Sequence, residues 1–179
     1  MLKGDGAGQL VSFLTLVEIA VAKHFRQKNV RLERIRRAHD FAAQRMGTDH
    51  PFAFARLAAL GGHVLAEFEK ESPGGGSLLA LEHPSEQWTL PGLVIETLSA
   101  LDFEAELASR WFPLGRGYPI VIDPRFAAGM PTIVERRVTV ETIRKRFKTG
   151  MSIEFIAHDL RLDNQTVEDV LRYGDRVAA

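Results

Sequence analysis

The sequence contains no cysteine, which excludes disulfide bonds, thiolate zinc sites and cysteine nucleophiles. It also contains no apolar run long enough to cross a bilayer. Its start, Met1-Leu2-Lys3-Gly4, lacks the apolar core of a signal peptide. We therefore expect a soluble, cytoplasmic protein without a membrane partner.

An excess of charge is missing as well, because 23 basic residues balance 23 acidic ones. This balance argues against a protein that coats nucleic acid through its overall charge, and it leaves only local basic patches as electrostatic footprints. With 179 residues, 45% of them hydrophobic, the chain is long enough to bury a core as one unit or as two small lobes.

Motifs of common enzymes are absent from the sequence. There is no Gly-x-Ser-x-Gly elbow, and the glycines at 74–76 precede no Lys-Ser/Thr pair, so they form a loop and not a phosphate-binding loop. The histidines of the middle region, His50, His63 and His83, lie near acidic residues at spacings that fit no metal signature. We expect no enzyme, no metal site and no cofactor.

The N-terminal part predicts two helices joined by a basic turn. Apolar residues recur at helical spacing from Phe13 to Phe25, and Thr15 with Glu18 matches a capping box. A second helix is expected over residues 31–46, with Gly47 as its C-cap. Its predicted inner face consists of Leu32, Ile35, His39, Ala42 and Met46.

Basic residues are concentrated in this turn and at the start of the second helix. The outer face of this helix should therefore be basic. These basic residues are Arg26, Lys28, Arg31, Arg34, Arg36 and Arg37. Such a cluster either contacts DNA phosphates or is only a solvated helix face. We favour phosphate contact, because a helix start is a natural phosphate site.

The middle region, residues 61–117, predicts a small α/β unit. The apolar runs at 64–68 and 78–81, joined by a Ser-Pro-Gly loop, indicate a β-hairpin. A helix should begin at Pro91, and a strand should follow over residues 104–111. The predicted buried face of this helix is Leu93, Val94, Thr97, Leu98 and Leu101. Trp88 and Trp111 are predicted to be anchors of the core or of an interface.

The C-terminal region, residues 118–179, predicts a hairpin followed by a helix-turn-helix module. Two β-branched runs, 120–122 and 132–134, flank a Gly-Met-Pro turn. Three short helices should then begin near Thr139, Ser152 and Asp163. Their predicted apolar faces are Val140, Ile143 and Phe147, then Ile153, Ile156, Ala157 and Leu160, then Val167, Val170 and Leu171.

A second group of candidate DNA contacts lies on the first and third of these helices. It consists of Arg144, Lys145, Lys148, Gln165, Thr166 and Arg172. The third helix also carries Glu168 and Asp169, which repel phosphates. For this helix we therefore favour protein binding or dimerisation over base readout.

Residues 119–173 resemble the homeodomain-like domain of unknown function, DUF433, that is found in VapB-type antitoxins of bacterial toxin–antitoxin pairs. The resemblance rests on Asp123-Pro124, on Gly129-x-Pro131-x-Ile133, on the Gly-x-Ser turn at 150–152 and on the run from Val167 to Tyr173. Where many members carry Gly-Thr-Arg after the hairpin, this chain has Glu-Arg-Arg at 135–137.

Residues 9–53 are similar to the second half of the MerR-like domain that precedes this module in longer VapB-like antitoxins. The first helix-turn-helix of that domain is expected to be missing here. The resemblance implies an α+β, mainly helical protein with a MerR-like region at 1–60, a middle region at 61–117 and a homeodomain-like module at 118–179.

The resemblance also implies the antitoxin of a type II pair. Such a protein binds a PIN-like, VapC-type ribonuclease toxin and, as a homodimer, binds operator DNA to repress its own operon. Arg136 and Arg137 are the candidate toxin-binding residues, because arginine complements an acidic, magnesium-dependent site. The alternatives are a stand-alone DNA-binding transcriptional regulator without a toxin and a dimerisation module.

Overall fold

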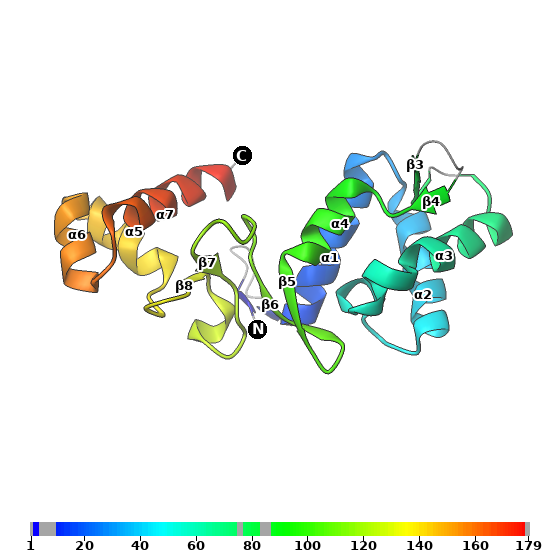
Figure 1. Ribbon diagram of the computed structural model, residues 1–179, viewed down its shortest axis with the longest axis horizontal. Helices are drawn as coiled ribbons and strands as arrows, with labels where there is room; N and C mark the ends of the chain where they lie inside the picture. Colours follow the sequence, from blue (N-terminus) through cyan, green and yellow to red (C-terminus); the bar gives the residue numbers. More distant parts are fainter. Residues whose placement is uncertain (1, 4–9, 75–76, 83–86, 178–179) are drawn as a thin grey trace.

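The computed structural model describes residues 2–3, 10–74, 77–82 and 87–177, arranged as two lobes along one long axis (Figure 1). The described part of the chain is mainly helical, with seven α-helices and four short antiparallel hairpins. It therefore has a mixed α+β architecture, as expected. None of the helices in this part combines the length and the apolar character that a bilayer-crossing segment needs.

The first lobe begins with the β1–β2 pair, Leu2–Lys3 with Leu10–Val11, and continues with α1, Phe13–Gln27. The buried stripe of α1 is, as predicted, spaced at four residues from Phe13 to Phe25. Its N-cap is Ser12, whose hydroxyl accepts the backbone N–H of Thr15 at 3.1 Å. The predicted capping box is therefore wrong, since Glu18 bonds to histidines instead.

Helix α2, Leu32–Met46, ends as predicted at Gly47, which has a left-handed φ of +68°. Ile35 and Ala42 are buried on its inner face, together with Ala38. Leu32 is exposed, and its assignment to this face is wrong. The reason is the helical stripe itself, which continues backwards from Ala42 and Ala38 to residues 34 and 35 and leaves position 32 outside.

The predicted hairpin at 64–68 and 78–81 is wrong in its first half. After a short 3-10 turn, Pro51–Ala53, the chain forms α3, Arg56–Glu71, which contains all of residues 64–68. Leu57, Leu65 and Phe68 are buried at spacings that place them on one side of this helix. Only the second run contributes a strand, β3 at Ala80–Glu82, which pairs with β4 at Gln87–Thr89.

Helix α4, Gly92–Ser99, matches the helix expected after Pro91. Val94, Thr97 and Leu98 are buried as predicted, and Leu93 is wrong because it is exposed. Strands β5, Leu101–Glu104, and β6, Leu107–Trp111, then form a hairpin. One strand was expected over 104–111, so β5, with buried Leu101 at its start, was missed. Trp111 packs against the core, and the side chain of Trp88 lies outside the described part.

The elements of the first lobe enclose one hydrophobic core that runs from Phe13 to Ile122. Its largest fully buried side chains are Phe25, Phe52, Leu57, Leu65 and Leu78. The core thus draws on residues from all three predicted regions. Helices α1, α2, α3 and α4 pack with β6, and Ile122 of the third region joins them. The division at 60 and 117 stays a prediction.

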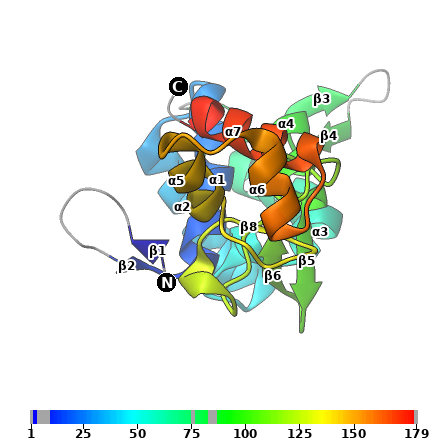
Figure 2. The same ribbon diagram turned by 90° about the vertical axis from the view of Figure 1, so that its left-hand side faces the viewer.

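The second lobe consists of the hairpin β7–β8, Ile120–Val121 with Thr132–Ile133, and of α5, Val140–Lys148, α6, Ile153–Leu160, and α7, Asn164–Val177 (Figure 2). The predicted caps are confirmed, because Thr139, Ser152 and Asp163 accept the backbone N–H groups of residues 142, 155 and 166. The helices enclose a second core that includes Ile143, Ile156, Val167 and Val170. Phe147 was expected on this buried side and is exposed, which corrects that assignment.

Candidate partner-binding surfaces

The predicted basic cluster of the first lobe lies around the α1–α2 turn, and most of it is exposed. Lys28, Arg31 and Arg36 have exposed side chains and no ionic partner in the part of the chain that the structure describes. Arg26 donates to the carbonyl oxygen of Val30 at 2.9 Å, and Arg37 donates to the hydroxyl of Ser72 at 2.6 Å. These five cations are available to a phosphate backbone.

Arg34 departs from this pattern, because it is only 8% exposed. Its guanidinium donates to the carbonyl oxygen of Ser72, lies 5.1 Å above the ring of Phe68 and is 3.9 Å from a carboxylate oxygen of Glu69. The expectation that Arg34 belongs to the exposed outer face is therefore wrong. This side chain ties α2 to α3 and cannot reach DNA without breaking those contacts.

The second predicted DNA-contact group lies on α5 and α7. Lys145 and Lys148 are exposed, Arg144 is half-exposed, and none of the three pairs with a carboxylate among the described residues. On α7, Gln165 donates to Asp169 at 3.0 Å and Arg172 pairs with Glu168 at 2.9 Å. Both side chains are exposed, so they remain candidates.

Thr166 cannot serve as predicted in base readout, because it is buried. Its backbone N–H and its hydroxyl both donate to the carboxylate of Asp163, at 2.7 and 2.9 Å. These bonds lower the pKa of Asp163, and the bond from the backbone N–H has the largest effect. Thr166 therefore helps to cap the N-terminus of α7, and the described side chains of this helix include the acidic Glu168 and Asp169 beside the basic Arg172.

The two predicted groups do not form one surface. The first lies around α1 and α2 and the second around α5 and α7, in different lobes (Figure 1). A DNA molecule that contacts both would have to follow the long axis of the protein.

Arg136 and Arg137, the candidate toxin-binding residues, lie between β8 and α5. Arg136 donates from Nε to the carbonyl oxygen of Arg161 at 3.0 Å, which joins this segment to the end of α6. Arg137 adopts a left-handed φ of +54°, and its guanidinium lies 4.0 Å from the ring centre of Phe126. Both side chains are exposed, and within the described residues neither has a carboxylate partner.

A cluster of one carboxylate and two histidines joins α1, α2 and the turn that follows. Glu18 lies 3.0 Å from Nε2 of His39 and 3.4 Å from Nδ1 of His50. The hydrogen bond to Glu18 raises the pKa of His39. His39 was predicted on the inner face of α2, but its partner Glu18 was not predicted, because it is 21 residues away in the chain. The described residues include no group of three such side chains with the arrangement to hold a metal ion.

The second lobe has a family match. Residues 120–174 match the family described as Protein of unknown function (DUF433). The chain is also similar to the crystal structure of Rv2018 from Mycobacterium tuberculosis, with 25% sequence identity and a TM-score of 0.80. That likeness covers 96% of this chain and 83% of the other. No curated protein matches the sequence.

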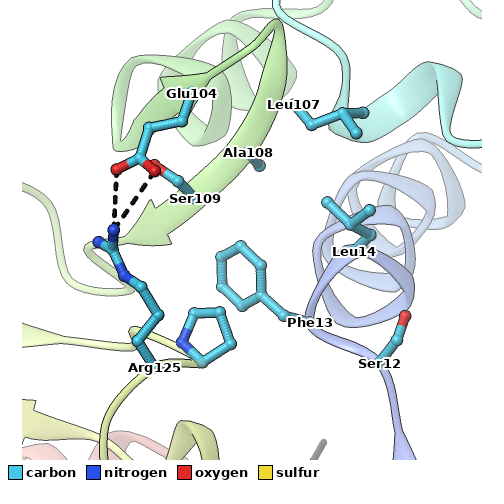
Figure 3. Close-up of a pocket in the computed structure, with 9 residues that line it drawn as sticks. Ser12, Phe13, Leu14, Glu104, Leu107, Ala108, Ser109 and Arg125 are labelled. Carbon is cyan, nitrogen blue, oxygen red and sulfur yellow. Dashed lines mark hydrogen bonds and ion pairs between the residues drawn. The ribbon is translucent and has the colours of Figure 1, made fainter.

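The DUF433 segment meets the first lobe at a hollow of about 340 Å³ (Figure 3). Phe13 of α1, Ala108 of β6 and Pro124 line it, and Arg125 reaches Glu104 across its rim at 3.0 Å. Arg125 also forms two bonds of 2.9 Å to the buried carboxylate of Asp123, and this guanidinium holds the pKa of Asp123 below its usual value. A larger hollow, about 570 Å³, lies at the end of α2 beside His50.

Proposed function

We propose that this chain is the antitoxin of a type II toxin–antitoxin pair, a cytoplasmic protein without catalytic activity that neutralises a PIN-like, VapC-type ribonuclease and represses its own operon. The observation that carries the proposal is the DUF433 segment, residues 120–174, which resembles the VapB-type module in its sequence motifs and folds into a hairpin and three capped helices. In this proposal, the first lobe is a MerR-like region.

Neutralisation is assigned to the exposed arginines of the segment. A PIN-like active site is acidic and binds magnesium, so an arginine without its own carboxylate partner can pair with the toxin's carboxylates. Arg136 and Arg137 meet this condition, and the bond from Arg136 to the end of α6 orients it on a packed element.

The first test is co-expression of this chain with the product of the adjacent reading frame. The neighbour alone should arrest growth, and this chain should restore growth and co-purify with it. The double substitution Arg136→Ala with Arg137→Ala should abolish rescue while thermal unfolding stays unchanged. The control is Arg56→Ala, because Arg56 is an exposed arginine of the first lobe that already pairs with Glu106, and this variant should rescue fully. Full rescue by the double variant would remove these two arginines from the toxin interface.

Operator binding is assigned to a homodimer that uses the exposed cations around the α1–α2 turn. Lys28, Arg31 and Arg36 support this role, because none is neutralised by a carboxylate in the described chain. Replacing Arg31 and Arg36 with alanine should reduce the slope of log affinity against log salt by about one for each lost phosphate contact. An unchanged slope would shift the DNA contact to Arg144, Lys145 and Lys148 of α5.

The alternative function is a stand-alone DNA-binding transcriptional regulator without a toxin. The hollow between Phe13 and Arg125 favours it, because 340 Å³ is the lower end of the size that holds a small effector. A neighbour that does not arrest growth and does not bind this chain, together with specific operator binding, would favour the regulator.

A further inference from the structure

Three large apolar side chains are exposed at the corner between α5 and α6. Phe147, Met151 and Phe155 are 45%, 38% and 56% exposed and follow one another at intervals of four residues. They occupy the last turn of α5, the connecting turn and the first turn of α6. We call these three residues the apolar corner. Exposed apolar side chains gathered in one place mark interaction sites more often than isolated ones do.

None of these three side chains belongs to the core of the second lobe. Helices α5 and α6 instead contribute Ile143 and Ile156 to this core, and both are fully buried. Phe147 lies one turn beyond Ile143, and the cap at Ser152 starts α6 so that Ile156 faces inward and Phe155 faces solvent. Helices α5 and α6 lie at the end of the molecule away from the first lobe (Figures 1 and 2).

The charges beside the corner indicate the partner's chemistry. Arg144, Lys145 and Lys148 belong to the same helix as Phe147 and lack a carboxylate partner in the described residues, whereas Arg146 is paired with Asp159. A complementary surface would have an apolar centre and a rim of carboxylates. A nucleic acid fits less well, because its phosphate backbone offers no apolar surface to cover the exposed Phe147 and Phe155.

We propose that the apolar corner and its three cations form a docking surface for a carboxylate-rimmed protein partner. The identity of this partner rests on the proposed function, in which it is the toxin. Arg136 contacts the far end of α6, about 12 Å away along an eight-residue helix. One interface of ordinary size covers both places, so the corner anchors the toxin while Arg136 enters its acidic site.

The test uses the full-length chain and the purified toxin candidate, the product of the adjacent reading frame. Binding is measured by titration calorimetry for the wild type, for Phe147→Ser with Phe155→Ser, and for Arg144→Glu with Lys148→Glu. The control is Ile19→Ser with Ile95→Ser, two first-lobe side chains that are 53% and 45% exposed. Thermal unfolding and operator binding are measured for each variant.

The aromatic double variant should bind at least about 100-fold more weakly, because buried aromatic anchors dominate interfaces. The charge-reversal variant should associate more slowly, most of all at low salt, and the control should match the wild type. If the wild-type chain does not bind the product of the adjacent reading frame, both the proposed toxin pairing and the proposed docking surface are contradicted. If both corner variants bind the toxin normally, the docking surface is contradicted while the toxin pairing stands. If they lose operator binding but not toxin binding, the apolar corner is a nucleic-acid contact instead.

Discussion

Arg34 and Arg36 stand two positions apart in one basic run, and the structure places them on opposite sides of α2. The helix turns about 200° between them, so Arg34 points toward α3 while Arg36 points to solvent. Their charge and spacing in the sequence do not separate these roles. The distinction comes from α3, which supplies Ser72, Phe68 and Glu69 as partners of Arg34.

The two arginines should therefore respond differently to the same substitution. Arg34→Ala should lower the free energy of unfolding by about 1–3 kcal/mol, because it removes a charged hydrogen bond in a buried place. Arg36→Ala should change it by less than about 0.5 kcal/mol. Urea unfolding measures both, and equal stability losses would contradict the assignment of Arg34 to the α2–α3 contact.

His39 predicts a pH dependence of stability. Its pKa is raised above 6.5, first of all by the hydrogen bond to Glu18 and further by Asp40. The folded state then binds the proton more tightly than the unfolded state does. The resulting stabilisation is complete below pH 6.5 and is lost as the pH rises through the pKa of the folded protein.

The check is urea unfolding at several pH values between about 5.5 and about 8. The wild type should lose stability toward the upper end of this range, and His39→Gln should lose less. His63→Gln is the control, because His63 is exposed and should leave the wild-type profile unchanged. A His39→Gln profile identical to the wild type would show that the Glu18 contact does not couple to folding.

At the scale of elements, α3 shows where a short pattern misleads. The run at 64–68 is apolar enough to suggest a strand, and the glycines that follow suggest a hairpin loop. The longer spacing from Leu57 to Leu65 and Phe68 is helical. The segment forms a helix and not the predicted strand, because α2 and β4 both pack on α3. A window of 16 residues carries the helical period, whereas five residues do not.

The end of α2 yields a matched pair of glycine substitutions. Gly47 has a left-handed φ of +68°, and Gly92 begins α4 without this constraint; both have open space at the Cβ position. Gly47→Ala should cost about 1–2 kcal/mol through its backbone alone. Gly92→Ala should be neutral or stabilising by up to about 1 kcal/mol. Thermal unfolding compares them, and equal effects would contradict the role of Gly47 as the C-cap.

At the scale of the whole molecule, the two lobes are connected where Trp111 pairs with Ile122. We call this connection the joint. The backbones of Trp111 and Ile122 bond to each other in both directions, at 3.0 and 2.8 Å, so the start of the DUF433 segment is an extra edge of the first lobe. Asp123 follows at once, and its buried carboxylate holds Arg125. This joint connects the core of the first lobe to the β7–β8 hairpin of the second.

Breaking the joint should destabilise the whole molecule. Asp123→Ala removes three hydrogen bonds to Arg125 and should cost about 1–3 kcal/mol. Arg125→Ala should be more harmful than Asp123→Asn at neutral pH, because it leaves the buried carboxylate without its cation. Urea unfolding gives the order of the variants, and the reverse order would contradict this account.

Acid should act on the same ion pair. The folded-state pKa of Asp123 is lowered, mainly by Arg125, so its stabilisation is present above pH 3.8 and is lost as the pH falls through the lowered value. The Asp123→Asn variant should lack this part of the acid dependence.

Several elements were predictable because the signals that specify them lie close together in the chain. The stripe of α1, the left-handed cap at Gly47, the hairpin at 120–133 and the three capped helices after Thr139 follow from periodicity and from cap residues within a few positions. These signals act over one or two helical turns, so no partner from elsewhere in the chain is needed to read them.

The availability of polar and apolar side chains to partners depends instead on how the elements pack against one another. Arg34 and Thr166 are buried, whereas Phe147 is exposed. Glu18 forms hydrogen bonds with His39 and His50. In each case the outcome depends on neighbours that packing brings together from other parts of the chain. The physical reason is that periodicity defines the faces of a helix, whereas burial of a face depends on the element that covers it.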